Sequence, residues 1–185
     1  MKKIILSGGP STGKSTTFEA LKDIYPDAYY VNEAAEIVIQ KEINKKDNDP
    51  SYTPIMPVTH YEEFAPLVIV QQLVSEQMIP EESELVFLDR SIIDNLGYLE
   101  HNGIREHIPD VKRRAKLAGY TLAFFCDWLG KFERTQIRQE SETEGLTIHT
   151  HLANAYHSSG VPVVHLPAIS VNERLTIIQN EIETL

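Results

Sequence analysis

Short apolar runs alternate along the chain with segments in which apolar residues recur every three or four positions. The runs predict buried strands at residues 3–7, 28–32, 85–89, 121–127 and 161–166. The periodic segments predict helices at about residues 18–25, 33–39, 60–78 and 146–158, and a last one from residue 170. Helical segments are also predicted over about 92–118, with an interruption near Asn102-Gly103. This order predicts an α/β fold in three layers, a five-stranded parallel sheet with helices on both faces.

Two polar stretches interrupt this alternation. Residues 44–59 carry Pro50, Pro54 and Pro57 and predict a long, mobile loop. Residues 128–145 carry charges of both signs and predict a lid-like segment. The chain has 185 residues, a length that suits a single domain over residues 1–185.

Composition narrows the class of protein. The formal net charge of -10 argues against a nucleic-acid partner, which needs a basic face. Cys126 is the only cysteine, so no internal disulfide forms and a reducing, cytoplasmic compartment is expected. The apolar stretch at the N-terminus stops at Ser7, too early for a secretory signal, and no other segment is long enough for a membrane span.

A phosphate-binding motif follows the first predicted strand. It reads Gly8-Gly9-Pro10-Ser11-Thr12-Gly13-Lys14-Ser15-Thr16 and fits G-x-x-x-x-G-K-[ST]. In this motif, the backbone N–H groups of the loop and of the next helix cradle phosphates. Lys14 reaches the outer phosphates and the Ser15 hydroxyl binds Mg²⁺, so the motif predicts a nucleotide site.

Three further candidates lie at or just after the end of the third predicted strand. Asp89 closes an apolar run, the Walker B arrangement, and is predicted to hold Mg²⁺ together with Ser15. Arg90 either contacts phosphate or substrate, or pairs with a neighbouring carboxylate. Asp94 is either a substrate contact or an acid that stabilises a helix N-terminus.

The second predicted strand ends in another acid, Glu33. It could accept the proton of a substrate hydroxyl, hydrogen-bond a magnesium-bound water, or simply begin a helix. Gln71 or Gln72, on the helix that would face Glu33, could hydrogen-bond a base; both could equally be polar helix surface.

Arg134 and Arg138 stand four residues apart and would share one face of a helix. On a lid, such a pair neutralises the transferring phosphoryl group and excludes water. The alternative is a solvated charged helix, because several glutamates are close by.

Other motif-like spellings are predicted to be chance matches. Residues 44–47 spell the guanine-reading N-K-x-D, but they precede the Walker B strand, and residues 94–97 spell D-x-x-G beyond the strand end. His149, His151 and His157 are expected to be surface or structural histidines, not a metal site.

The phosphate loop, residues 31–35, residues 88–91 and the ending from Tyr156 to Arg174 together resemble a small AAA-labelled P-loop family. That family is related to the ribosylnicotinamide kinase domain of the bacterial NAD regulator, and its broad group includes a photoreceptor translocation-defect protein. The resemblance implies a nucleoside-kinase-like fold with sheet order 2-3-1-4-5. It also implies an adenine site near Pro167, Ala168 and Ile169.

More distantly, Asp89-Arg90-Ser91 is similar to the E-R-S motif of deoxynucleoside kinases, and Glu33 to their base. The sequence departs from that pattern because position 89 is Asp, and because no aromatic substrate-pocket pattern is evident.

Two functions follow from these residues. The first is a phosphotransferase, in which ATP with Mg²⁺ phosphorylates a hydroxyl of a nucleoside or nucleoside-like acceptor. The acceptor would bind between residues 44–59 and the Glu33–Gln72 side. The alternative is a nucleotide-dependent switch, or a binding ATPase or GTPase, without a small acceptor. Turnover that depends on an acceptor separates the two.

Overall fold

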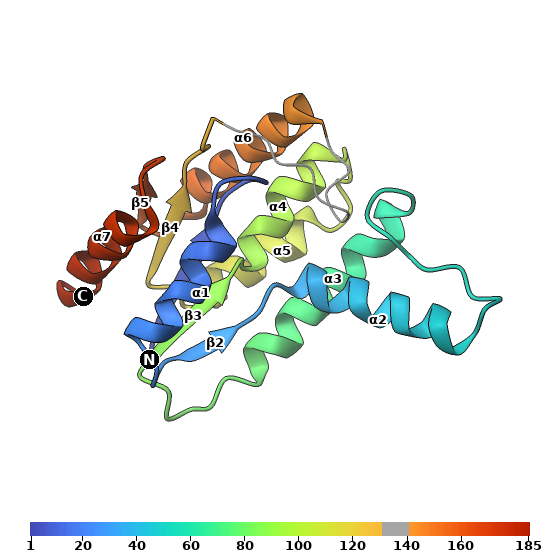
Figure 1. Cartoon of the computed structure of the whole chain (residues 1–185). Helices are drawn as coiled ribbons and strands as arrows, with labels where there is room; N and C mark the ends of the chain where they lie inside the picture. Colours follow the sequence, from blue (N-terminus) through green and yellow to red (C-terminus); the bar gives the residue numbers. More distant parts are fainter. Residues whose placement is uncertain (131–140) are drawn as a thin grey trace.

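One parallel sheet forms the centre of the protein. The computed structural model describes residues 1–130 and 141–185. Within them the sheet has five strands in the order β2-β3-β1-β4-β5 (Figure 1), which confirms the predicted order. The strands are β1 (Lys2–Ser7), β2 (Tyr29–Val31), β3 (Leu85–Asp89), β4 (Leu122–Cys126) and β5 (Val163–Leu166).

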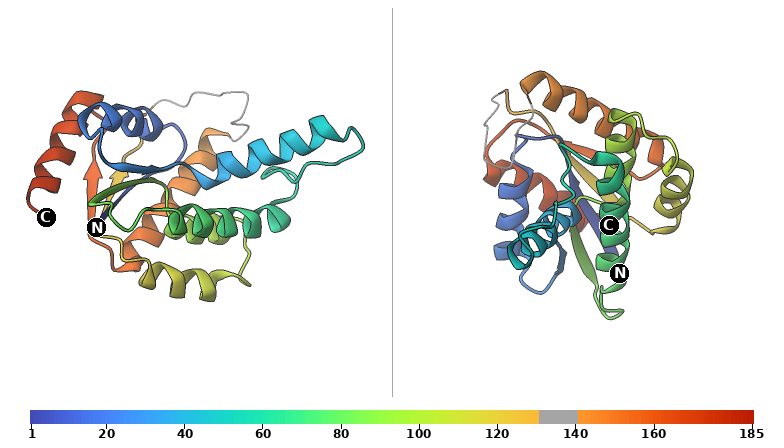
Figure 2. Two further views of the ribbon diagram at one scale, coloured as in Figure 1. Left: turned by 90° about the horizontal axis from the view of Figure 1, so that it is seen from below. Right: turned by 90° about the vertical axis from the view of Figure 1, so that its right-hand side faces the viewer.

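Helices cover both faces of the sheet (Figures 1 and 2). On one face lie α1 (Lys14–Ile24) and α7 (Val171–Glu183). On the other lie α3 (Tyr61–Gln77), α4 (Ile92–His101), α5 (Ile108–Leu117) and α6 (Glu142–Ser159). α2 (Ala34–Asn48) packs against α3, and both helices extend beyond the sheet.

The alternation of side chains along the strands explains the two layers. In β1, Ile4 and Leu6 pack against α1 and α7, whereas Ile5 faces the other layer. In β4, Phe124 packs on the side of α1 and α7, and Phe125 faces the other layer. All five side chains are at most 1% exposed, and full burial of such a side chain contributes about 1.5–3 kcal/mol.

The second helix is longer than the sequence predicts. Residues 44–48 belong to α2, so the prediction that the loop begins at residue 44 is wrong. Polar side chains support the extra turns: Gln40 Nε2 donates to Asn44 Oδ1 at 2.9 Å, and Asn48 Nδ2 donates to the Asn44 carbonyl at 2.8 Å. The spelling N-K-x-D therefore lies on a helix, on exposed residues, as expected of a chance match.

The sixth helix begins earlier than predicted, at Glu142. Ser141 caps it: its hydroxyl accepts from the Glu144 N–H, and Glu144 accepts in return from the Ser141 N–H. The end of the predicted lid-like segment 128–145 is therefore the first turn of α6. A reciprocal cap of the same kind, Ser170 with Glu173, begins α7, the helix that the sequence predicts from residue 170.

The parallel sheet brings several predicted site residues to one edge. The chain leaves β1 into the phosphate loop, β2 ends just before Glu33, and β3 ends in Asp89. Carboxyl ends of parallel strands form the ligand-binding edge in such folds. In the described residues, no helix is both long enough and apolar enough to cross a membrane.

Candidate functional site

The phosphate loop leads directly from β1 into α1. Gly13 stands at the N-cap of α1 in a left-handed conformation, with φ of 73°, and no side chain caps the helix. The N–H groups of the first turn are therefore available to an anion, and the positive end of the helix dipole points at it.

A histidine supports the loop from α6. The Gly9 N–H donates to His149 Nδ1 at 3.2 Å. A Cβ at Gly9 would lie only 2.7 Å from His149 Cβ, so this close approach requires glycine. Burial lowers the pKa of His149, which keeps the ring neutral and Nδ1 free to accept. His149 thus has a structural place, and the described residues hold no cluster of three or more His, Cys, Asp or Glu side chains suited to a metal ion.

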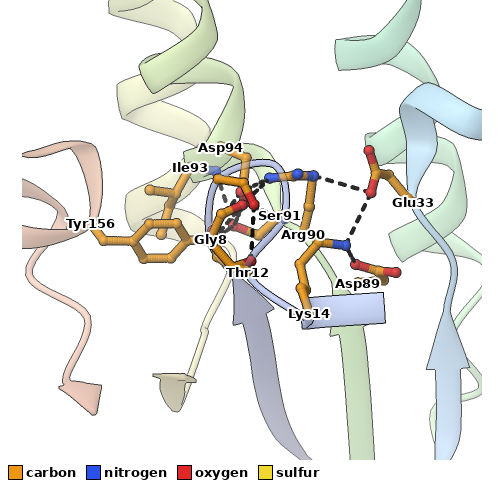
Figure 3. Close-up of polar contacts among 12 residues, drawn as sticks. Gly8, Thr12, Lys14, Glu33, Asp89, Arg90, Ser91, Ile93, Asp94 and Tyr156 are labelled. Carbon is orange, nitrogen blue, oxygen red and sulfur yellow. Dashed lines mark hydrogen bonds and ion pairs between the residues drawn. The ribbon is translucent and has the colours of Figure 1, made fainter. Parts of the chain in front are cut away.

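Four charged side chains meet beside the loop (Figure 3). The Lys14 ammonium contacts the Asp89 carboxylate, and its Nζ lies 3.1 Å from Glu33 Oε2. Arg90 Nε lies 3.1 Å from the same Glu33 oxygen. The sequence predicts that these residues gather at the sheet edge, and the structure brings them together in one network of two cations and two carboxylates.

The network sets the charge of each member. Burial alone would raise the pKa of Glu33, but Arg90 and Lys14 outweigh burial and lower this pKa to about 2. Burial alone would lower the pKa of Lys14, but the Glu33 and Asp89 carboxylates together outweigh burial, and the pKa is raised. Burial raises the pKa of Asp89, and the nearby Lys14 ammonium offsets this rise only in part. At neutral pH, Lys14 is therefore a cation and Glu33 an anion.

Arg90 takes an uncommon backbone conformation for a side-chain-bearing residue, with φ of 68°. Such a conformation costs about 1–3 kcal/mol and persists where neighbouring contacts fix it. Here Arg90 Nη1 donates to the Gly8 carbonyl at 3.0 Å and to Asp94 Oδ1 at 3.1 Å. Of the two alternatives for Arg90, pairing with carboxylates is the one seen, and the pairing ties β3 to the phosphate loop.

Asp94 is surrounded by donors. Its carboxylate accepts from Ser7 Oγ at 2.6 Å, from the Ser91 N–H at 2.8 Å and from the Tyr156 hydroxyl (Figure 3). With Ser91 it forms the reciprocal cap of α4. These contacts favour the helix-start alternative for Asp94.

Ser15 and Asp89 border one polar hollow, together with Asn32, Glu33 and Glu36. Hydroxyl and carboxylate oxygens are the hard ligands that Mg²⁺ prefers, and Mg²⁺ sites in proteins use only one or two carboxylates plus substrate phosphates. The residues present therefore fit a magnesium site at the predicted place.

A cavity of about 430 Å³ runs from the phosphate loop past Glu33 to α3 and α4. One face of α3 lines its far end with Tyr61, Phe64, Val68 and Gln72, at helical spacing. Tyr98 of α4 lies there too. The sequence shows no obvious aromatic pocket, yet the packing of α3 against α4 builds one.

The structure separates the two candidate glutamines. Gln72 is 1% exposed, lines the cavity, and donates from Nε2 to Glu76 Oε1 at 2.9 Å. Gln71 turns away, bonding Lys41 and Ser75.

Other predicted residues lie elsewhere. Pro167 and Ala168 follow β5 and are exposed. Arg134 and Arg138, the proposed lid pair, lie outside the described residues.

The sequence matches, over residues 3–174, the model of a family described as an AAA domain. The chain belongs to this family. No curated protein matches the sequence.

Solved structures show the same fold. Deoxyadenosine kinase from M. mycoides has a TM-score of 0.73 at 12% identity, covering 99% of this chain and 100% of its own. Thymidylate kinase from Candida albicans has a TM-score of 0.69 at 13% identity, covering 99% and 91%. Thymidylate kinase from Ehrlichia chaffeensis has a TM-score of 0.63 at 13% identity, covering 97% of each chain. The P-loop kinase fold of this AAA-domain chain is thereby confirmed.

Besides the aromatic residues of the cavity, sequence reasoning missed a residue that supports the phosphate loop. Arg174 of α7 is 1% exposed, and its guanidinium donates to the phosphate-loop carbonyl of Thr12. A signal was present, because Arg174 falls on the apolar stripe of its helix with Val171, Leu175 and Ile178. A charged residue on such a stripe needs buried partners.

Proposed function

We propose that this protein is an ATP- and Mg²⁺-dependent kinase that phosphorylates a hydroxyl group of a nucleoside-like acceptor. One observation carries the proposal: a single cavity has the phosphate loop at one end, an aromatic wall at the other, and Glu33 and Arg90 between them. A donor and an acceptor bound at the two ends would meet at these charged residues.

At the donor end, the loop N–H groups and Lys14 bind the triphosphate. Mg²⁺ held by Ser15 and Asp89 would neutralise charge on the transferring phosphoryl group. Lys14 exchanges its carboxylate partners for phosphate oxygens when the nucleotide binds. The adenine is proposed to lie near Pro167 and Ala168.

Glu33 orients or deprotonates the acceptor hydroxyl. In the free protein, Arg90 and Lys14 keep its pKa at about 2, which makes it a weak base. Movement of Lys14 toward the phosphates removes one of these cations, and the loss of a nearby cation raises the pKa of a carboxylate. Nucleotide binding would therefore strengthen the base. Arg134 and Arg138 are proposed to neutralise the γ-phosphoryl group from the lid.

At the acceptor end, Tyr61, Phe64 and Tyr98 offer surfaces on which a planar base can stack, and Gln72 can hydrogen-bond its edge. A mostly apolar cavity with a few polar groups is typical of a small-molecule site.

Charge favours a nucleoside over a nucleoside monophosphate. Among the described residues that line the cavity, the cations are Lys14 and Arg90, and both are paired with carboxylates. Glu33, Glu36 and Asp94 line it as well. An acceptor phosphate would find no uncommitted cation among these residues. The solved structures of like fold include both a deoxyadenosine kinase and thymidylate kinases, which supports a nucleoside-like acceptor in general.

A panel of acceptors tests the proposal. Release of ADP from ATP with Mg²⁺ is measured with ribonucleosides, deoxynucleosides, ribosylnicotinamide and thymidine monophosphate. Strong stimulation by one nucleoside, with little by the monophosphate, is expected. Slow hydrolysis that no acceptor changes would contradict the kinase and support a nucleotide-dependent switch.

A further inference from the structure

Arg174 is the largest fully buried side chain in the described residues, and it bonds three separate segments. Nη1 donates to the Thr12 carbonyl at 2.6 Å, in the phosphate loop. Nε donates to the Pro167 carbonyl at 2.8 Å, after β5, and Nη2 to the Asp127 carbonyl at 3.5 Å, after β4. One guanidinium therefore connects the loops that follow β1, β4 and β5.

Among the described residues, no acidic side chain forms an ion pair with this guanidinium. Within residues 1–130 and 141–185, no carboxylate lies at ion-pair distance from Arg174, and its hydrogen-bond acceptors there are three backbone carbonyls. Nη1 lies so close to the loop that a Cβ at Gly13 would be 3.2 Å from it. A buried cation is costly without compensation. An anion on the opposite side of the loop would supply that compensation.

The bond to Thr12 also orients the loop. A trans peptide unit is planar, so its C=O and the following N–H point in opposite directions. Because the Thr12 carbonyl is bound to Arg174, the Gly13 N–H points away from Arg174, toward the side where a phosphate would be cradled.

We propose that Arg174 is a positioning residue of the nucleotide site. It fixes the phosphate loop against the segments after β4 and β5, and it places a buried positive charge behind the bound phosphates without touching them. This role concerns nucleotide affinity alone and depends on neither the acceptor nor the transfer step.

Two substitutions in the full chain test it. Arg174→Met keeps the length of the side chain and removes its charge and hydrogen bonds. Arg174→Lys keeps the charge, but one ammonium cannot bond three separated carbonyls. Arg113→Met is the matched control, since Arg113 is exposed on α5 and pairs only with the exposed Asp110 among the described residues.

The measurement is the Kd for ADP with Mg²⁺ and for inorganic tripolyphosphate, by titration calorimetry. Arg174→Met is expected to raise the Kd for both probes by about tenfold or more, equivalent to about 1.4 kcal/mol. The Kd values of Arg174→Lys are expected to lie between those of the wild type and Arg174→Met. Those of Arg113→Met are expected to match the wild type.

Thermal unfolding without ligand separates positioning from simple stabilisation. A purely structural role would lower the Tm and leave the Kd of the folded protein unchanged, so a folded Arg174→Met with wild-type affinity overturns the proposal. If Arg174→Met does not fold, Arg174→Lys decides: weakened affinity supports positioning, and unchanged affinity overturns it.

The proposed kinase reaction can fail separately. A wild-type chain that binds ADP but phosphorylates no acceptor contradicts the kinase and leaves the role of Arg174 standing. A wild-type chain that binds neither probe overturns both.

Discussion

The two ends of the cavity are built in different ways. The donor end consists mostly of the backbone of residues 8–16, with side chains of His149 and Arg174 bonded to it from α6 and α7. The acceptor end consists of side chains from α2, α3 and α4, and of Pro57 from the loop between α2 and α3. The donor end can therefore keep its geometry whatever the acceptor, whereas single side chains set the shape and polarity of the acceptor end.

The loop that contributes Pro57 is fastened by one buried carboxylate, Glu42 of α2. It accepts from the Tyr52 hydroxyl at 2.6 Å, from the Ile55 N–H at 3.0 Å and from Lys45 Nζ at 2.5 Å. A wall of the acceptor end thus depends on a few hydrogen bonds. The phosphate loop of the donor end, in contrast, is connected through Arg90 and Arg174 to the segments that follow β3, β4 and β5.

The largest effect is expected at the donor end. Lys14→Ala removes the cation that the phosphates need, takes from Asp89 its ion-pair partner among the described residues, and leaves Glu33 paired with Arg90 alone. ATP turnover should fall by at least about a hundredfold, the effect of losing one preorganised charge-stabilising group. ADP release measures it, with Arg113→Met as the control. Turnover within tenfold of wild type would contradict the assignment of residues 8–16 as the phosphate site.

Glu33 lies between the donor end and the acceptor end of the cavity, and Glu33→Gln tests whether it acts as the base. If Glu33 acts as the base, acceptor-dependent kcat should fall by about 10²–10⁴-fold, because a positioned base contributes that much. The KM for ATP should change little. The control is Glu62→Gln, an exposed glutamate in the first turn of α3. Full acceptor-dependent turnover by Glu33→Gln would rule out Glu33 as the base.

A smaller, selective effect is expected at the acceptor end. Gln72→Leu removes a polar group from the aromatic wall and should raise the KM for the acceptor by about 10–100-fold, the effect of a polar substrate group left unpaired. The KM for ATP should stay constant. Gln71→Leu, one residue away and outside the cavity, should change neither. Equal effects of the two variants would contradict the acceptor site on α3.

The smallest effect on chemistry is expected from Glu42, whose role is in stability. Glu42→Gln should lower the free energy of unfolding at pH 7 by about 1–3 kcal/mol, because charge-assisted hydrogen bonds to Tyr52, Lys45 and Ile55 are weakened. Denaturant unfolding measures this, with the exposed Glu63→Gln as the control.

The same variant has a predicted pH dependence. Burial would raise the pKa of Glu42, but bonds from Lys45, Tyr52 and Ile55 lower it from 4.5 to about 2 in the folded protein. A lowered pKa stabilises the fold above the unfolded value and loses this contribution as pH falls toward the folded value. The gap between wild type and Glu42→Gln should therefore narrow from pH 4.5 toward 2. A gap that widens over this range would contradict the assignment.

The donor end was predictable because its signal is local. Nine consecutive residues spell the loop, and the rule that strand ends meet places Glu33, Asp89 and Arg90 beside it. The aromatic wall was not, because Tyr98 reaches Tyr61 and Phe64 only through the packing of α4 against α3. The extra turns of α2 were missed for a similar reason: two partners of Glu42, Tyr52 and Ile55, lie beyond the helix end, where prolines suggested a loop.

The close contact between α4 and α6 has a consequence for how the protein moves. A Cβ at Gly97 would lie 2.9 Å from the backbone N and Cα of Leu152, so the two helices meet almost backbone to backbone. Helices that interlock this tightly do not slide past one another without opening a void. We therefore expect the side of the cavity that Tyr98 lines to keep its position when a molecule binds. Within the described residues, we expect a narrowing of the cavity around a bound molecule to come from α2, α3 and the loop that Glu42 fastens.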